Sequence, residues 1–255
     1  MSVHLISAAQ AMAQLDQFDA ILDARSEGEH AEDHLPGAQS WPSLNNEERI
    51  RVGTLYKQVS PFEAQKIGAA LVAKNIAHHI ETRVMDKPKN WQPLIYCWRG
   101  GKRSNSLALI LGQIGFKVHL IEGGYKAFRK EVMEDTPRQA QRLQFQVLCG
   151  PTGSGKTRLL QALAQEGAQV LDLEAIACHR SSVLGLIPGT QQPTQKAFDT
   201  QVWDALRGFS ADRPVYVEAE SKKVGNLTVP AELIVAMRAS PCLRVDLSLE
   251  NRVNL

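Results

Sequence analysis

The chain has 255 residues, of which 44% are hydrophobic and 22% are charged, and its net charge is +2 at neutral pH. This composition is ordinary for a globular protein, and the length allows two small domains. It excludes a polycation that binds nucleic acid through bulk charge, so any such contact must come from local clusters of Lys and Arg.

The N-terminus and the cysteines indicate the compartment. Residues 1–4 lack a basic region followed by an apolar run, so no signal peptide is predicted. No window reaches the roughly 18 apolar residues that a membrane span needs. Cys97, Cys149, Cys178 and Cys242 lack the close spacing of zinc ligands, so no structural metal is expected. We predict a cytoplasmic protein without a membrane segment, in which Cys97 remains a free thiol.

In the first half, short apolar runs alternate with helical patterns. Strands are predicted at residues 20–23, 94–96 and 118–121, and helices at residues 61–80 and 104–112. Leu35-Pro36-Gly37-Ala38 is a turn signal. Strands that alternate with helices favour an α/β fold with a parallel sheet.

A charged segment ends this half. We predict a first domain at residues 1–128, a charged linker helix at 129–143 and a second domain at 144–255. This segment contains Pro137, and a turn into the second domain is expected to follow the helix. In the second domain, strands are predicted at 144–149, 169–173 and 214–218, with a helix at 158–165.

Residues 97–104 form the first of two loops suited to an anion. Cys97 follows a predicted strand and precedes a predicted helix, whose positive end favours a nucleophilic thiolate. Two glycines let the backbone curl so that N–H groups face an anion, three cations attract it, and Ser104 is predicted to cap the helix. The expected anion-binding residues are Arg99, Gly100, Gly101, Lys102, Arg103 and Ser104.

Residues 150–157 form the second loop, which has the spacing of a phosphate-binding P-loop between a strand and a helix. Its expected phosphate ligands are Gly150, Thr152, Gly153, Ser154, Gly155, Lys156 and Thr157. Thr157 can also ligate Mg²⁺, together with an acid at Asp172 or Glu218, although either acid could equally cap a helix. The spacing predicts a diphosphate or triphosphate without specifying a nucleotide.

Further polar clusters occupy predicted loops at strand ends, where α/β sheets bind ligands. They lie at residues 179–182, which follow Asp172-Leu173-Glu174, and at residues 195–196 and 218–225. Each cluster is either solvated loop or part of a binding site.

The first half resembles the rhodanese family. Residues 97–104 resemble its active-site loop, and residues 22–25, 34–38 and 121–125 resemble its other signatures. The resemblance implies that Cys97 accepts sulfur or selenium in a persulfide-type intermediate. The same loop spells the Cys-x5-Arg-Ser pattern of cysteine phosphatases, which would make Arg103 a phosphate clamp. Tyr96 stands where phosphatases usually place a His, which weakens that alternative.

A rhodanese-like domain joined to a P-loop domain resembles the tRNA 2-selenouridine synthases. The similar stretches are residues 46–49, 52–57, 96–101, 171–174, 179–180, 195–198 and 218–225. The resemblance implies a rhodanese-like parallel-sheet domain followed by a P-loop NTPase-like α/β domain. It also implies that geranyl diphosphate alkylates wobble 2-thiouridine in tRNA and that selenophosphate then replaces the geranylthio group with selenium. Selenophosphate synthetase is an implied partner, and no tightly bound cofactor is expected.

The end of the chain departs from this pattern. Relatives look to continue beyond residues 250–255, so the second domain is expected to be incomplete. The alternatives that stay open are a sulfurtransferase or a cysteine phosphatase with a regulatory P-loop domain, and an inactive remnant that binds tRNA. The sequence leaves the oligomeric state and the tRNA isoacceptors open.

Overall fold

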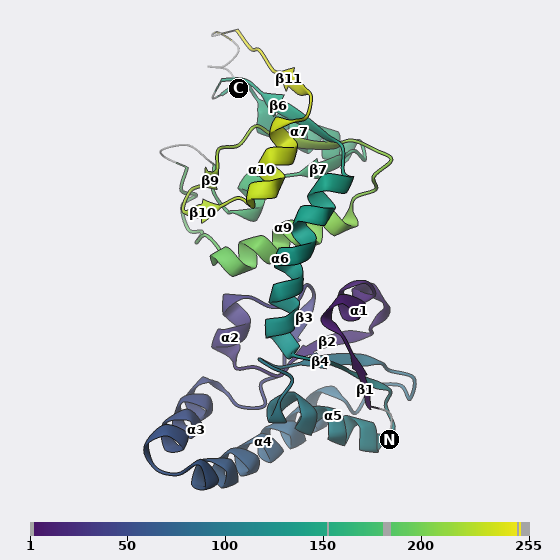
Figure 1. The fold of residues 1–255 in the computed structure, drawn as a ribbon, viewed down its shortest axis with the longest axis vertical. Coiled ribbons are helices and arrows are strands. Elements are labelled where there is room, and N and C mark those ends of the chain that lie inside the picture. Colours follow the sequence, from purple (N-terminus) through teal and green to yellow (C-terminus); the bar gives the residue numbers. More distant parts are fainter. Residues whose placement is uncertain (1–2, 152, 181–184, 249, 251–255) are drawn as a thin grey trace. The chain divides into compact units, whose positions relative to one another are not determined.

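The computed structural model describes residues 3–151, 153–180, 185–248 and 250. The chain forms two compact units, Met1–Glu131 and Val132–Leu255. The boundary falls inside the helix α6 (Gly124–Arg142). Each unit contains a parallel sheet flanked by helices (Figure 1), which confirms the predicted α/β class.

The first unit is built on a five-stranded sheet with the order β1-β5-β4-β2-β3, in which every pairing is parallel. The strands are β1 (Val3–Ile6), β2 (Ala20–Asp23), β3 (Ala38–Ser40), β4 (Pro93–Tyr96) and β5 (Val118–Ile121). β2, β4 and β5 confirm the predicted strands, whereas β1 and β3 were not predicted. All four residues of β4, the central strand, are buried. The cysteine loop follows the C-terminal end of this strand.

Helices cover this sheet. They are α1 (Ala8–Met12), α2 (Glu27–Glu32), α3 (Asn46–Gln58), α4 (Pro61–Arg83) and α5 (Lys102–Ile114), with a short 3-10 turn at Leu15–Gln17. Ser60 caps α4 and Pro61 opens it, a combination that favours a helix start. α3 and α4 pack closely at Gly68, where an added Cβ would lie only 3.3 Å from the Val52 side chain. Trp41, Ile76, Ile95 and Leu107 belong to the buried core.

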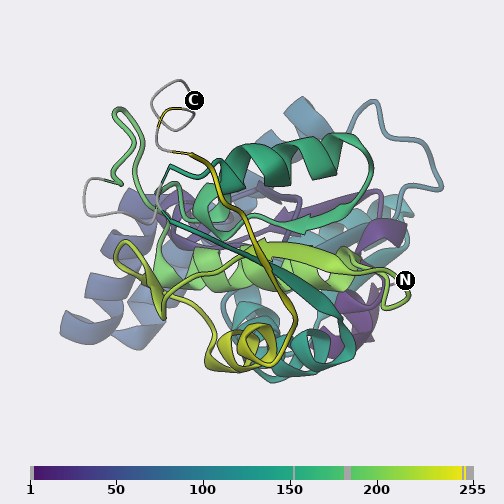
Figure 2. The same cartoon turned by 90° about the horizontal axis from the view of Figure 1, so that it is seen from above.

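The second unit has a four-stranded parallel sheet with the order β11-β6-β8-β7. Its strands are β6 (Phe145–Cys149), β7 (Gln169–Leu171), β8 (Val215–Glu218) and β11 (Cys242–Arg244), and β9 (Lys223–Val224) and β10 (Leu227–Thr228) form a separate hairpin. Its helices are α7 (Lys156–Gln165), α8 (Leu173–Ile176), α9 (Gln195–Gly208) and α10 (Ala231–Arg238). α7 and α10 lie on opposite sides of the sheet (Figure 2). Phe198, Val202 and Leu233 are fully buried in the core of this unit.

β7 differs from its prediction, whereas α6 spans the predicted linker helix except for its last residue. β7 ends at Leu171 instead of residue 173, because Asp172 caps α8 by accepting a hydrogen bond from the Ala175 N–H at 2.8 Å. α6 continues past Pro137 to Arg142. The Arg142 guanidinium donates to the carbonyl of Phe209 at 2.8 Å, and such tertiary contacts override the helix-breaking tendency of proline.

Two further observations concern membrane-spanning helices and the cysteines. Within the described residues, no helix is both long and apolar enough to span a membrane. Cys149 of β6 and Cys242 of β11 form a disulfide with a Cα–Cα distance of 6.3 Å, whereas Cys97 is a free thiol. The sequence did not predict this pairing.

Candidate functional site

Cys97 follows β4 directly, and the loop that begins with it leads into α5 at Lys102, as the sequence pattern predicts. Its side chain is buried, and Sγ accepts hydrogen bonds from the Gly101 N–H at 3.2 Å and from the Ser104 hydroxyl at 3.0 Å. These two hydrogen bonds fix the position of the sulfur within the loop. The predicted role of Ser104 as a helix cap was wrong: Gly101 is the N-cap of α5, and the Ser104 hydroxyl faces the sulfur instead.

A glycine turn after β5 holds the cysteine loop in place. The Tyr125 N–H donates to the Cys97 carbonyl at 2.8 Å, and the Lys126 N–H donates to the Trp98 carbonyl at 3.1 Å. Gly124 has a φ of +56°, and a Cβ there would overlap the Cys97 carbonyl oxygen. Gly124 is therefore a positioning residue for the loop that the site prediction did not include. Its only signal was the resemblance of residues 121–125 to the rhodanese family.

The three cations predicted around this loop differ in their surroundings. Arg103 pairs with Glu29 at 2.7 Å, and Arg49 pairs with the same carboxylate at 3.0 Å. Burial raises the pKa of Glu29, but the hydrogen bond and charge of Arg103 outweigh it and hold that pKa below its usual range. Arg99 and Lys102 are exposed and, within the described chain, form no ion pair. These two side chains can meet an incoming anion without first leaving a partner.

A buried ionic network lies behind the glycine turn. The Arg25 guanidinium pairs with Asp23 at 2.6 Å and stacks over the Tyr125 ring at 3.9 Å. The Tyr125 hydroxyl donates to Asp33 at 2.7 Å. Burial raises the pKa of Asp23, but hydrogen bonds from His30 and Arg25 together with the Arg25 charge lower it overall. The network joins the Asp-x-Arg signature at residues 23–25 to the turn that positions Cys97.

The P-loop lies between β6 and α7, as its spacing predicts. Gly155 caps α7 with a φ of +84°, and Lys156 Nζ lies over the loop, 3.2 Å from the Gly150 carbonyl and 3.3 Å from that of Pro151. The Ser154 hydroxyl is buried without a hydrogen-bond partner among the described residues. A lysine, a helix N-terminus and a buried hydroxyl in need of a partner suit a phosphate. Gly153 is part of the same loop and exposed, and Thr152 lies outside the described residues.

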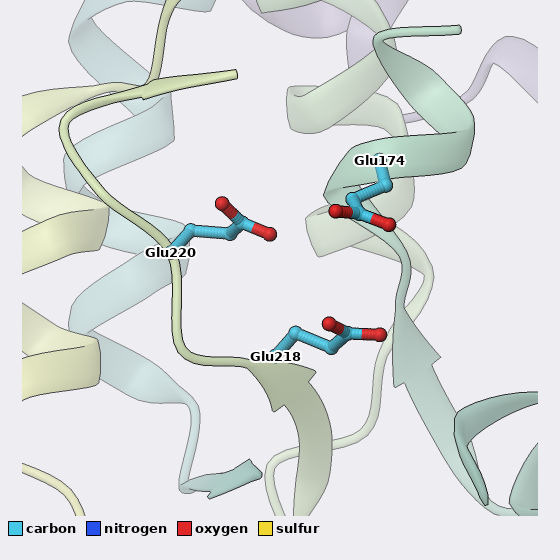
Figure 3. Close-up of side chains that lie close together, drawn as sticks. All are labelled: Glu174, Glu218 and Glu220. Atoms are coloured by element: carbon cyan, nitrogen blue, oxygen red, sulfur yellow. The ribbon is translucent and has the colours of Figure 1, made fainter. Parts of the chain in front are cut away.

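Carboxylates gather beside the P-loop (Figure 3). Glu218 is buried at the end of β8 and accepts a hydrogen bond from the Thr157 hydroxyl at 2.7 Å. One carboxylate oxygen each from Glu174, Glu218 and Glu220 lies within 4.8 Å of the others. Burial, followed by the neighbouring Glu218, Glu220 and Asp172, raises the pKa of Glu174 to about 7. Oxygen ligands of this kind are those that Mg²⁺ prefers, so these three carboxylates and the Thr157 hydroxyl could hold it.

The two acids predicted at the P-loop therefore have different surroundings. Glu218 contacts Thr157, whereas Asp172 caps α8. The site prediction did not include Glu174 and Glu220. Both belong to polar clusters that follow predicted strands, and position at the carboxyl end of a parallel strand was the only signal that could have selected them.

Comparison with known proteins covers both units. Residues 7–131 match the family model for a rhodanese-like domain, and residues 143–255 match that for the tRNA 2-selenouridine synthase AAA domain. Curated tRNA 2-selenouridine synthases are 34% identical in Marinobacter nauticus, 35% in Alcanivorax borkumensis and 32% in Bdellovibrio bacteriovorus. The matches cover 91%, 92% and 100% of this chain, and 63%, 64% and 68% of those relatives. The chain belongs to the tRNA 2-selenouridine synthase family.

This membership confirms the resemblance found in the sequence and the order of the two domains. The cysteine loop lies in the region that matches the rhodanese-like domain, and the P-loop lies in the region that matches the AAA domain of tRNA 2-selenouridine synthase. The chain spans less than two thirds of the length of three of the tRNA 2-selenouridine synthases that it matches, at 61–64%.

Proposed function

We propose that this chain is a tRNA-modifying transferase that converts wobble 2-thiouridine into 2-selenouridine through S-geranyl-2-thiouridine. The observation that carries the proposal is a pair of anion-binding loops in one member of this family. Only the first loop contains a thiol, which is hydrogen-bonded by two donors, and the second is a P-loop with a lysine over it. Two loops of different chemistry suit two phosphorylated substrates, selenophosphate and geranyl diphosphate.

The P-loop serves the geranyl step. Lys156 and Ser154, with the N-terminus of α7, bind the diphosphate group. The nucleoside sulfur attacks the geranyl carbon, a C–S bond forms, the C–O bond breaks and diphosphate leaves. The loop stabilises the charge that collects on the departing diphosphate. Mg²⁺, held by Glu174, Glu218, Glu220 and Thr157, would neutralise part of the same charge.

The cysteine loop serves the selenium step. Arg99 and Lys102 attract selenophosphate, and we assign to Cys97 the handling of its selenium. At C2 of the geranylated base, a C–Se bond forms and the C–S bond breaks, so the geranylthio group leaves as a thiolate. The P–Se bond of selenophosphate breaks as well, and water takes the phosphoryl group, which is released as phosphate. A selenophosphate synthetase must supply the anion, which makes it the proposed partner. Because tRNA is the proposed substrate, we propose that the protein acts in the cytoplasm.

Mass spectrometry of tRNA nucleosides tests the proposal. The purified chain is incubated with tRNA containing 2-thiouridine, geranyl diphosphate and selenophosphate, and the products are 2-selenouridine and its S-geranylated precursor. Cys97→Ser is expected to stop selenation and leave geranylation intact, whereas Lys156→Ala is expected to reduce geranylation about 100-fold or more. Cys178→Ser, at the other free thiol, and Lys74→Ala, at an exposed lysine of α4, are the matched controls.

Other outcomes would replace the proposal. Full selenation by Cys97→Ser would remove the role of the thiol, and full geranylation by Lys156→Ala would remove that of the P-loop. Unchanged tRNA with a folded protein would overturn the transferase function. In that case sulfur transfer from thiosulfate would indicate a sulfurtransferase, and hydrolysis of a phosphotyrosine analogue that Arg103→Ala abolishes would indicate a phosphatase. Tight tRNA binding without any turnover would indicate a non-catalytic binding protein.

A further inference from the structure

The first unit contains an apolar groove between α3, α4 and α5, with a volume of about 890 Å³. Its walls are aliphatic, and they include Val52 of α3, Gly68, Ala69 and Val72 of α4, and Leu109 and Ile110 of α5. The volume lies within the range of small-molecule sites, which are mostly apolar with a few polar groups at defined places. Leu109 is 47% exposed, which is unusual for a large aliphatic side chain that lines a concave surface.

The polar end of the groove belongs to the cysteine loop. Lys102 and Arg103 line the groove, and both lie between Gly101 and Ser104, the two residues that hydrogen-bond to Cys97 Sγ. α5 thus presents Ser104 to the sulfur and presents Ser106 and Ile110 to the groove. An apolar groove whose wall includes two cations of the cysteine loop fits an amphiphile whose polar end lies at these cations and whose aliphatic chain lies along the helices.

The proposed selenium step supplies such a ligand. Selenium must reach C2 of the nucleoside, and the geranyl group is attached to that carbon through a single sulfur atom. When C2 lies at the cysteine loop, the isoprenoid chain therefore begins at the loop as well. Covering this chain with the apolar walls of the groove removes it from water, which favours binding.

We propose that the groove between α3, α4 and α5 binds the geranyl chain of the S-geranylated tRNA nucleoside during the selenium step. This assignment rests on the proposed function and adds a recognition site to it. Binding of the chain aligns C2 with the cysteine loop and distinguishes the geranylated nucleoside from unmodified 2-thiouridine. Diphosphate has no part in this site, because it leaves in the preceding step.

Substitutions that fill the groove test the proposal. Ala69 and Ala70 are neighbouring exposed residues of α4, and only Ala69 lines the groove. The probes are two anticodon stem-loop RNAs that differ only in carrying S-geranyl-2-thiouridine or 2-thiouridine. We expect the native chain to bind the geranylated RNA more tightly, Ala69→Phe to reduce that preference about tenfold, and Ala70→Phe to change it less than twofold.

A second pair of variants distinguishes an effect on the groove from a loss of folding. Leu109→Glu places a carboxylate in the groove, whereas Ile114→Glu alters a residue of α5 that is 50% exposed and does not line it. Only Leu109→Glu is expected to lose the preference for the geranylated RNA, with circular dichroism confirming the fold of both. A preference that survives in Ala69→Phe and Leu109→Glu would overturn the groove assignment, and so would equal affinity of the native chain for the two RNAs.

Turnover of tRNA, measured in parallel, separates the two proposals. If the native chain turns over tRNA and the groove variants keep its preference for the geranylated RNA, only the groove assignment is overturned. No turnover together with no binding of either RNA overturns the proposed function and the groove with it.

Discussion

Glu29 ties two arginines to the cysteine loop through one nearly buried carboxylate. Because its pKa lies below the usual value near 4.3, the folded state keeps the carboxylate ionised at a pH where the unfolded chain binds a proton. The stability that Glu29 contributes is thus fully present above about pH 4.3 and is lost as the pH falls through the lower folded value.

Glu29→Gln should therefore flatten the pH dependence of the free energy of unfolding between about pH 5 and pH 3. Chemical denaturation at a series of pH values measures this slope, and the exposed Glu47→Gln gives the comparison profile. An unchanged slope in Glu29→Gln would mean that the ion pairs with Arg103 and Arg49 contribute nothing to stability.

For single residues, the spacing in the sequence correctly predicted Cys97 at a strand end and Lys156 in a P-loop. It could not show that Arg103 is paired, because its partner Glu29 lies 74 residues earlier in the chain. Nor could it select Glu174, which approaches Glu218 only after two separate strands pair in one sheet. Contacts set by tertiary structure leave no trace in residue spacing.

The turn that follows β5 makes the clearest prediction about a structural element. Gly124 and Gly37 both adopt left-handed backbone, with φ of +56° and +72°, but only a Cβ at Gly124 would meet another backbone atom. Gly37→Ala should cost about 1–2 kcal/mol from its backbone alone. Gly124→Ala should cost more, since the Cys97 carbonyl must also move.

Thermal denaturation compares the two alanine variants, and the rate at which Cys97 reacts with iodoacetamide reports on the loop. Gly124→Ala should change that rate, whereas Gly37→Ala should leave it near the native value. Equal stability and equal thiol reactivity in the two variants would show that the glycine turn does not position the cysteine loop.

The elements that the sequence predicted best are those with strong local patterns, such as β4, α4 and α7. The sequence predicted β7 too long and did not predict that α6 begins as early as Gly124. The ends of β7 and α6 both depend on hydrogen bonds formed in the fold. One is the cap that Asp172 provides, and the other is the contact of Arg142 with the end of α9. β1 was not predicted, because its four residues alternate weakly and gain their stability by pairing with β5.

For the whole molecule, the alternation of strands and helices predicted two α/β domains, but it did not give the order of strands in either sheet. Each unit has its own buried core, so a cavity in one core should lower the stability of that unit and leave the other unit unchanged. Phe198→Ala removes a fully buried ring from the second unit and should destabilise it by about 3–5 kcal/mol.

Hydrogen–deuterium exchange measures this separately for each unit. Phe198→Ala should accelerate exchange in β6 and β8 and leave β4 and β5 unchanged, while Gln201→Ala, at an exposed position of α9, should alter neither. Equal acceleration in β4 would show that the two units unfold as one.

The burial of Cys97 also determines which chemical labels can reach it. The chain has two free thiols: Cys97 is 3% exposed at the base of its loop, whereas Cys178 is partly exposed. A bulky maleimide should therefore label Cys178 and spare Cys97, whereas a compact reagent can reach both. The same shielding should make exchange with a bulky disulfide, such as oxidised glutathione, slower at Cys97 than at Cys178.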